Sequence, residues 1–471
     1  MAASQDLLSL IGSEDTLRRW NVEAPMGTSV VVTFSFPEAS AEYNFEEVPG
    51  FQAFSELHKV WVRQAMDTWS AAGGISFVEV PADIGGQVTF SMRDMTGLVN
   101  SVGKQLSGYA YYPRTQGWNG SYESLYHDVG GDVFVNAAYY ALDSNSIAPG
   151  IRGYSILLHE IGHALGLKHP FESGAVITPG HDNGFYTIMS YNRSHSTTQL
   201  GTVDREAIQH LYGATDLNGS WNSKFKAVVH NGSDAGELII GLQINDIIKG
   251  NKGNDELNGK EGNDRLFDGG GNDTVYGGAG RDFVLAGNKG QDVYDGGEGR
   301  DHISYAESVG GVRVSLESGL GAGGWARGDG IVNFENVTGS NGGDDTLTGN
   351  QKANVLKGLA GRDQLFGAGG KDRLFGGNGD DKLDGGRGND LMVGGKGADT
   401  FVFGRRAGDD TIKDFHDGID QLSFDRIGTW TVSRLLGKAS QIDDDVLFQF
   451  GNGDSLMVEN VTLEMLSDSI A

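Results

Sequence analysis

The residues with the clearest chemical potential lie in one short segment, Leu158–Pro170, which reads LHEIGHALGLKHP. His159 and His163 are four residues apart, so a helix would place both imidazoles on one face, one turn apart. Gly166 can end that helix in a left-handed conformation and turn the chain back, which would bring His169 to the other two histidines. Three imidazoles with a fourth position left open are the ligands of a catalytic zinc ion, so the spacing predicts such a site.

Glu160 follows the first of these histidines directly, and its carboxylate can reach a water molecule bound to the metal. Zinc lowers the pKa of bound water to about 7. Glu160 is therefore predicted to take a proton from that water and pass it to a leaving amine. A bare H-E-x-x-H is moderately specific, whereas the full H-E-x-x-H-x-x-G-x-x-H spacing disfavours the alternative of ordinary surface or core histidines.

A second motif, Tyr186-Thr-Ile-Met-Ser-Tyr191, places Met189 20 residues after His169. A lone methionine among apolar residues usually packs in a core. At this distance from the three histidines, it matches the tight turn that holds a methionine beneath the zinc ion in metzincins. The motif therefore supports the zinc site.

The elements that must position these residues belong to an α+β domain, predicted to cover residues 1–217. Strands are predicted at Ser29–Ser35, Ile75–Val80, Gln87–Met92 and Asp132–Asn136. Helices are predicted where apolar residues recur at helical spacing, at residues 57–69, 156–165 and 204–212. Asp132–Asn136 is predicted to be an edge strand that pairs with the backbone of an extended substrate.

The composition changes after about His230, where glycine, aspartate and asparagine alternate with single aliphatic residues. The chain has 75 Gly but 8 Pro, so the glycine excess belongs to a regular architecture other than collagen. Residues 376–384, GGNGDDKLD, fit the repeat G-G-x-G-x-D-x-U-x, in which U is a large aliphatic residue. Two such arrays, at residues 241–304 and 340–403, predict an all-β parallel β-roll over residues 218–403, closed by a segment at residues 404–471.

Aspartates recur every nine residues in these arrays and would form rows of like charge along the edges of the roll. Calcium takes six to eight oxygen ligands and can bridge the carboxylates and turn carbonyls of neighbouring coils, so folding and calcium binding are predicted to be coupled. The predicted ligands in the first array are Asp246, Gly253, Asp255, Gly262, Asp264, Gly271, Asp273, Gly280, Asp282, Asp292 and Asp301. Those in the second array are Asp345, Gly361, Asp363, Gly370, Asp372, Gly379, Asp381, Gly388, Asp390, Gly397 and Asp399. The aliphatic residues predicted to point inward include Leu257, Leu266, Val275, Leu365, Leu374 and Leu383.

Together these motifs resemble the serralysin family of metzincin metalloproteases, which carry a C-terminal RTX calcium-binding β-roll. The resemblance covers nearly the whole chain, and Pro170 after the third histidine and Ser190-Tyr191 after Met189 strengthen it. It implies one catalytic zinc ion and several structural calcium ions, and it leaves open whether the first 15–20 residues are a removable propeptide. It also implies that Tyr191 is a further zinc ligand that can swing away to hydrogen-bond the transition-state oxyanion.

The family is exported by type I secretion machinery that reads an uncleaved C-terminal signal, which agrees with the absence of a signal sequence in Met1–Trp20. We therefore expect a secreted, extracellular bacterial zinc endopeptidase, monomeric, that acts on proteins or peptides. The net charge of -27 argues against nucleic acid as a partner, and no apolar stretch reaches the length of a membrane span. The alternative is a calcium-stabilised RTX surface or adhesion protein with an inactive metzincin domain, although the ligands, the base and both turns are all present.

Overall fold

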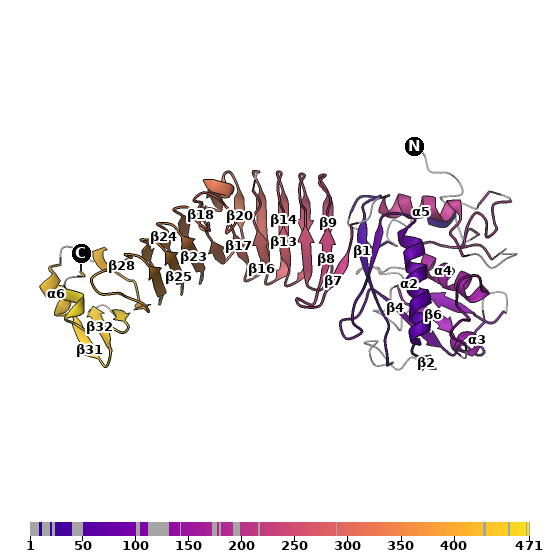
Figure 1. Ribbon diagram of the computed structural model, residues 1–471, viewed down its shortest axis with the longest axis horizontal. Helices are drawn as coiled ribbons and strands as arrows, with labels where there is room; N and C mark the ends of the chain where they lie inside the picture. Colours follow the sequence, from indigo (N-terminus) through magenta and orange to yellow (C-terminus); the bar gives the residue numbers. More distant parts are fainter. Residues whose placement is uncertain are drawn as a thin grey trace. The chain divides into compact units, whose positions relative to one another are not determined.

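The computed structural model describes residues 9–11, 19–20, 24–39, 50–99, 104–111, 131–141, 143–171, 177–178, 180–191, 198–214, 217–288, 290–426, 430–450, 453–467 and 469–470. The chain forms two compact units, Met1–Ser223 and Lys224–Ala471 (Figure 1). The separate closing segment at residues 404–471 remains a prediction. Within the described residues, no helix is long and apolar enough to cross a membrane.

The first unit is built on a mixed sheet with the strand order β3-β1-β4-β6-β5. Its strands are β1 (Val30–Ser35), β2 (Phe51–Gln52), β3 (Ile75–Glu79), β4 (Val88–Arg93), β5 (Gly108–Ala110) and β6 (Val133–Asn136), and β7 (Ser220–Asn222) contacts β3. Strands β3, β1, β4 and β6 are parallel, whereas β5 runs antiparallel to β6 and β2 runs antiparallel to β4. The strands predicted from β-branched runs are thus confirmed.

The predicted edge strand is wrong in one respect, because Asp132–Asn136 supplies β6, which lies between β4 and β5. The strand order ends with β5 on this side of the sheet and with β3 on the other. The three residues of β5, Gly-Tyr-Ala, show neither alternation nor β-branching. A strand this short forms because β6 offers it a partner, so the sequence carries no local signal for it.

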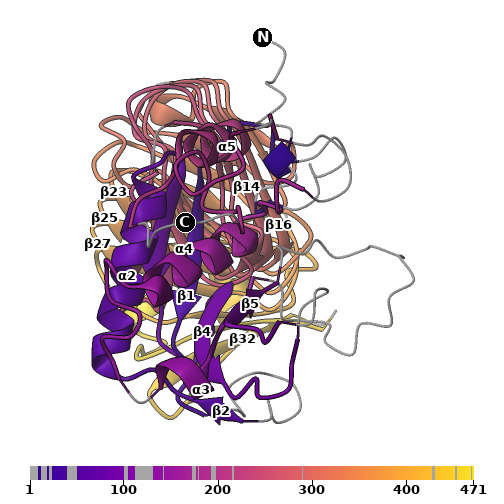
Figure 2. The same cartoon turned by 90° about the vertical axis from the view of Figure 1, so that its right-hand side faces the viewer.

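Helices α2 (Glu56–Ser70), α3 (Ala137–Tyr140), α4 (Arg152–Ala164) and α5 (Thr202–Tyr212) complete this unit. Helices α2 and α4 pack against each other and against the sheet, with α4 contacting β5 and β6 (Figure 2). Ser55 caps α2, since its hydroxyl accepts from the His58 N–H at 3.3 Å. Every residue of α4 after Arg152 is buried, which is the pattern of a helix enclosed in a core.

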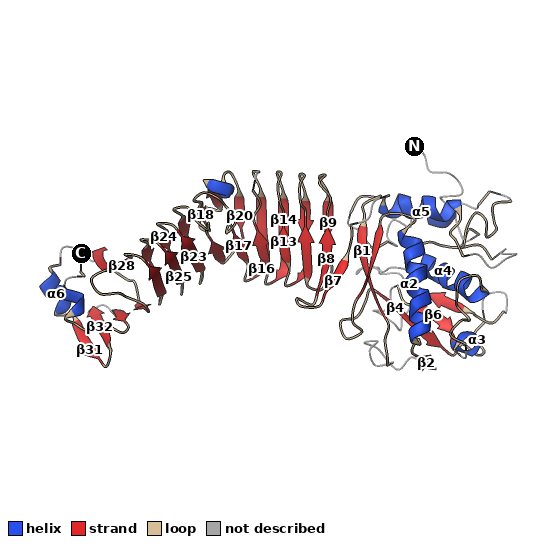
Figure 3. Cartoon of the chain, viewed as in Figure 1, coloured by secondary structure: helices blue, strands red, loops and turns tan. Residues whose placement is uncertain are grey.

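The regular elements of the second unit are almost all strands, joined by short turns and loops (Figure 3), and these strands alternate between two long, mainly parallel sheets. One sheet contains β8 (Ala227–Asn231), β10 (Asp246–Lys249), β13 (Arg265–Phe267), β15 (Phe283–Leu285), β17 (His302–Ser304), β21 (Asn336–Thr338), β23 (Val355–Ala360), β25 (Arg373–Asn378), β27 (Leu391–Lys396), β29 (Asp409–Ile412), β33 (Asp454–Val458), β32 (Asp445–Phe450) and β31 (Ala439–Ile442). The other contains β9 (Leu238–Ile240), β11 (Glu256–Asn258), β12 (Glu261–Gly262), β14 (Thr274–Gly280), β16 (Val293–Gly299), β20 (Gly330–Val332), β19 (Leu320–Ala322), β18 (Arg313–Ser315), β22 (Thr346–Thr348), β24 (Gln364–Phe366), β26 (Lys382–Asp384), β28 (Thr400–Gly404) and β30 (Gln421–Arg426). Short helices η3 (Gly324–Ala326), α6 (Val432–Leu436) and η4 (Met465–Ser467) are attached to them.

The register of these sheets explains the repeat. Leu257 aligns with Val275, and Leu365 aligns with Leu383, each 18 residues further along, so two nonapeptides make one coil. These side chains are fully buried between the sheets, as predicted. The predicted α+β domain followed by a parallel β-roll is therefore confirmed.

Candidate metal centre

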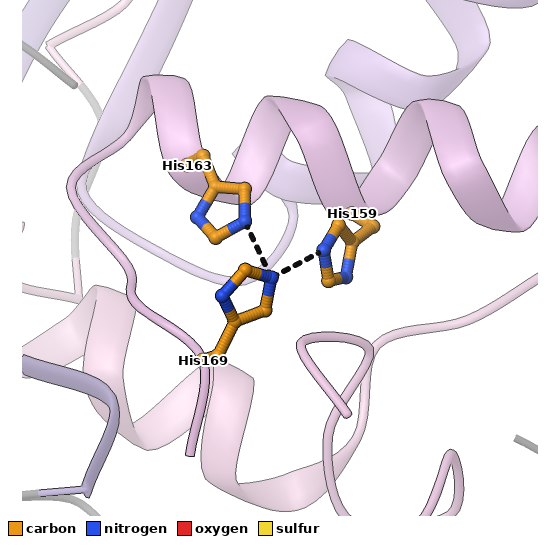
Figure 4. Close-up of side chains that lie close together, drawn as sticks. All are labelled: His159, His163 and His169. Atoms are coloured by element: carbon orange, nitrogen blue, oxygen red, sulfur yellow. Dashed lines mark hydrogen bonds between the residues drawn. The ribbon is translucent and has the colours of Figure 1, made fainter. Parts of the chain in front are cut away.

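Helix α4 carries two of the three predicted zinc ligands on one face, and the chain that follows it returns the third. The Nε2 atom of His169 lies 3.1 Å from the Nε2 atom of His159 and 3.1 Å from that of His163 (Figure 4). Gly166, between them, has φ +97°, the positive value predicted for the turn. His159 and His163 are buried, at 3% and 7% exposure. The sequence-predicted ligands thus meet at one point.

The hydrogen bonds on the far side of two rings orient them toward that point. His159 Nδ1 lies 2.9 Å from the Ile188 carbonyl oxygen, and His163 Nδ1 lies 2.7 Å from the Leu167 carbonyl oxygen. A carbonyl only accepts, so each neutral ring carries its proton on Nδ1 and turns the lone pair of Nε2 toward His169. Nitrogen lone pairs this close to one another repel, so the arrangement favours a cation between them. A tetrahedral zinc ion with bonds of about 2.0–2.1 Å would set its nitrogens about 3.3 Å apart, so the three histidines fit zinc.

The predicted methionine turn packs directly beneath this helix. A Cβ atom added to Gly162 would lie 2.5 Å from Met189 Sδ and 3.1 Å from the Trp69 ring. Glycine at this position therefore lets the sulfur approach the helix between the two histidines. The same turn supplies the Ile188 carbonyl that orients His159, so its position and the ring orientation are coupled.

Asp204, on α5, holds the methionine turn in place and was not predicted to have a role at the site. Its fully buried carboxylate accepts hydrogen bonds from Thr187 Oγ1 at 2.6 Å, from Ile188 N at 2.8 Å and from Gly201 N at 2.8 Å. Acidic residues are common in the first turn of a helix, so the position of Asp204 gives no signal of this role in the sequence. The contact with Thr187 and Ile188 depends on tertiary structure, which the spacing does not reveal.

The C-terminal end of α4 is fixed by two side chains distant in sequence. Tyr212 donates its hydroxyl to the Leu165 carbonyl at 2.9 Å, and Trp20 Nε1 donates to the Ala164 carbonyl at 3.0 Å. The last carbonyls of a helix lack partners within the helix, so these bonds satisfy them. They stabilise the turn that leads to His169.

Glu160 and Tyr191, the other two residues predicted for the zinc site, lie next to the histidines. Glu160 is 7% exposed, and its Cγ atom lies 3.1 Å from the position of a Cβ atom added to Gly108 of β5. The Tyr191 ring centre is 4.5 Å from that of His169 and 5.7 Å from that of His159, and 55% of this residue is exposed. Glu160 therefore lies against the edge strand, and Tyr191 borders the open side of the histidine cluster.

In the second unit, the predicted aspartates form ladders between successive coils. Each except Asp301 donates its backbone N–H to the Oδ1 atom of the aspartate one coil later, as in Asp255 to Asp273 at 2.7 Å and Asp363 to Asp381 at 2.8 Å. The second oxygen, Oδ2, is buried without a hydrogen-bond partner among the described residues in Asp255, Asp264, Asp273, Asp282, Asp301, Asp363, Asp372, Asp381, Asp390 and Asp399. Burial raises the pKa of Asp381 to about 7. Rows of buried carboxylate oxygens suit a hard cation such as calcium.

The predicted glycines of the turns all have positive φ values. Those of Gly253, Gly271 and Gly370 are +125°, +153° and +120°. A Cβ atom on Gly271 would lie 1.4 Å from the Gly253 carbonyl oxygen of the adjacent coil. Glycine is required there by both conformation and close approach.

Three predicted calcium ligands differ from the others because protein groups occupy both of their oxygens. Asp246 Oδ1 lies 2.9 Å from His230 Nε2, and its Oδ2 accepts from Leu242 N at 2.6 Å. Asp345 Oδ1 accepts from Val312 N at 2.7 Å, and its Oδ2 accepts from Ser340 N at 2.6 Å. Asp292 Oδ1 accepts from Asp273 N at 2.8 Å, and its Oδ2 accepts from the Tyr294 hydroxyl at 3.2 Å. Asp246 and Asp345 each lie at the start of an array.

The ladders also recruit acidic residues that the nine-residue spacing does not predict. Asp329 accepts from Asp292 N at 3.1 Å and Glu335 accepts from Asp301 N at 2.9 Å, which carries both ladders into the interruption between the arrays. Asp410 and Asp420 accept from Asp390 N and Asp399 N, each at 2.9 Å. Insertions separate these residues from the repeat, so only the strand register identifies them.

Comparison with known proteins agrees with both halves of the chain. The matrixin family matches residues 38–213, and the RTX calcium-binding nonapeptide repeat matches residues 231–266, 250–284, 269–303, 340–374 and 366–401. A serralysin from Proteus mirabilis is 30% identical over 227 residues, which cover 43% of this chain and 44% of that protein. Metallopeptidase AprA from Pseudomonas marginalis is 30% identical over 209 residues, which cover 39% of each protein. Serralysin G from Dickeya chrysanthemi is 26% identical over 211 residues, which cover 41% of this chain and 42% of that protein.

The chain thus matches less than half the length of each of these relatives. The matrixin domain implies zinc, and the RTX repeats imply calcium. The resemblance predicted from the motifs is confirmed. The chain carries a matrixin domain followed by RTX calcium-binding repeats, and proteins named serralysin are among its relatives.

Proposed function

We propose that this protein is a zinc endopeptidase that hydrolyses peptide bonds in protein substrates and depends on calcium for the fold of its second unit. The proposal rests mainly on the convergence of three Nε2 atoms, since that of His169 lies 3.1 Å from those of His159 and His163. The rings of His159 and His163 are also held in the tautomer that a metal requires. His159, His163 and His169 would hold one zinc ion. Tyr191 borders the same cluster and would serve as a further ligand.

A bound zinc ion would supply a water of lowered pKa and polarise the scissile carbonyl. Glu160, the residue after the first ligand, would accept the proton of that water and deliver it to the leaving amine. Tyr191 would donate its hydroxyl to the oxyanion of the transition state, because a ring with 55% exposure can move away from the histidines. This role is a proposal from the resemblance and from the ring contact with His169.

The edge strand β5 would bind the substrate backbone. Tyr111 N donates to the Asp132 carbonyl at 3.0 Å, and Asn136 N donates to the Ser107 carbonyl at 3.0 Å, so alternate residues of this segment pair with β6. The backbone groups of Gly108 and Ala110, between them, point away from β6. An extended peptide could add there as a further strand, beside Glu160.

The calcium ligands would be the ladder aspartates and the carbonyls of the glycine turns. Buried carboxylates in rows are destabilising until a cation neutralises them, so the second unit should require several calcium ions. Export by type I machinery and an extracellular, monomeric state are proposed on the resemblance alone.

The test is hydrolysis of casein by the full chain in excess calcium, comparing the wild type with Glu160→Gln. Glu56→Gln, at an exposed position in the first turn of α2, is the matched control. We expect Glu160→Gln to lose about 10²–10⁴-fold in kcat/KM, with bound zinc unchanged and the control fully active. An inactive wild type with zinc bound and the roll folded would refute the peptidase and favour a calcium-stabilised surface protein.

A further inference from the structure

One turn of the first array departs from the repeat at a position that is glycine in the other turns of that array. Gly250, Gly259 and Gly277 each stand five residues before a ladder aspartate, whereas Asp268 stands five residues before Asp273. Asp268 is fully buried. A carboxylate inside the roll, outside the repeat pattern, is costly unless the fold uses it.

The surroundings of Asp268 are also irregular. Its Oδ2 atom accepts from the Tyr294 hydroxyl at 2.6 Å, and its Oδ1 atom accepts from Gly269 N at 2.9 Å. Tyr294 occupies an inward-pointing position, aligned with Val275 and Ile331 in the neighbouring coils. Its hydroxyl also lies 3.2 Å from Asp292 Oδ2, so one polar side chain joins two carboxylates.

Asp268, Asp273 and Asp292 together form a cluster with the composition of a cation site. One carboxylate oxygen from each lies within 4.8 Å of the others, and all three residues are buried. Asp273 Oδ2 is buried without a hydrogen-bond partner among the described residues, in a side chain whose residue is 2% exposed. The Coulombic interactions of Asp273 and Asp292 are with other carboxylates, including Asp268. Their charges therefore add, and nothing in those interactions offsets them.

We propose that Asp268, Asp273 and Asp292, with the hydroxyl of Tyr294 beside them, form a calcium site of higher charge than the repeat provides elsewhere, and that this site binds calcium most tightly. An ordinary coil offers a pair of stacked aspartates, whereas this one offers three carboxylates. More negative ligands raise the affinity of an oxygen site for calcium. The inference rests on the proposed calcium role of the roll and is independent of the peptidase activity.

The test is calcium titration of the full chain against a competing chromophoric chelator. Asp268→Asn keeps the shape of the side chain and removes its charge, and Asp268→Gly restores the residue of the other turns. Asp381→Asn, in an ordinary position of the second array, is the matched control. We expect both Asp268 variants to weaken the tightest class of sites by about tenfold or more, whereas Asp381→Asn should weaken only the looser class.

Terbium provides a second readout, because a tyrosine close to the ion sensitises its emission. The first equivalent of Tb³⁺ added to the wild type should emit under tyrosine excitation, and Tyr294→Phe and Asp268→Asn should lose that emission. If Asp268→Asn and Asp268→Gly bind calcium like the wild type while Asp381→Asn is weakened, the inference fails and the calcium role stands. If all three variants bind like the wild type, the calcium role of the repeat fails as well.

Discussion

Replacing Asp204 with asparagine should weaken zinc binding even though Asp204 is not a ligand. Its two oxygens accept from three donors, one on Oδ1 and two on Oδ2. Asparagine has one accepting oxygen. In one orientation of the amide, this oxygen accepts from Ile188 N and Gly201 N, and the Thr187 hydroxyl loses its acceptor because it faces the amide nitrogen. In the opposite orientation, Ile188 N and Gly201 N lose their acceptor.

At least one buried bond is therefore lost or weakened, at a cost of about 1–3 kcal/mol. The turn that loosens carries the Ile188 carbonyl, 2.9 Å from His159 Nδ1. Loss of such a supporting contact lowers metal affinity by about 10–100-fold. Zinc affinity would be measured by competition with a chelator in excess calcium, with unfolding by denaturant followed in parallel.

Asp94→Asn is the control, because Asp94 is exposed and, among the described residues, its carboxylate accepts hydrogen bonds from Thr96 alone, at 2.6 and 2.9 Å. It should leave zinc affinity unchanged. Wild-type zinc affinity and stability in Asp204→Asn would refute the coupling between the methionine turn and His159.

Three further outcomes are expected. Gly162→Ala should destabilise the first unit by about 1–3 kcal/mol in denaturant unfolding, because its Cβ would lie 2.5 Å from Met189 Sδ; an unchanged midpoint would contradict that packing. Ala110→Pro should lower kcat/KM on peptide substrates about fivefold, because it removes one N–H that would bind the substrate backbone. The change should appear mainly as a higher KM, and kinetics equal to the wild type would exclude β5 as the strand that binds substrate. Burial raises the pKa of Asp372 from 3.8 to about 7. Without calcium the folded state thus binds more protons than the unfolded state between these values, so the stability of chelator-treated protein should fall as pH rises from about 4 to 7. Saturating calcium should abolish that fall, and a rise in stability over the same range would contradict the sign.

The clustering of the three histidines was predictable because its geometry is local. Four and six residues separate the ligands, and helical periodicity followed by one glycine turn determines where they meet. The β-roll was predictable for a similar reason, since a nine-residue repeat fixes the register of each coil on the next. In both cases the information lies within a short stretch of chain.

The parts that sequence reasoning missed depend on contacts between distant segments. Strand β5 exists because β6 pairs with it, and Asp204 reaches Ile188 through the packing of α5. Asp329 joins its ladder across a 37-residue separation from Asp292, where the repeat spacing no longer applies. The nine-residue spacing identifies aspartates that keep the period of the repeat, but it does not identify one that an insertion has moved out of that period.

The side-chain bonds of the aspartate ladders all run one way along the roll. In each rung the donor is the earlier residue and the acceptor is the later one, from Asp246 to Asp264 through to Asp399 and Asp420. The N–H of the residue after a ladder aspartate runs the other way, since Thr274 N donates to the Asp255 carbonyl and Lys382 N donates to the Asp363 carbonyl, each at 2.8 Å. A coil therefore needs both of its neighbours before all these donors have acceptors, and a growing roll carries an unsatisfied N–H at whichever end it grows from. Folding of the roll is thus expected to be cooperative along its length and not tied to one starting end.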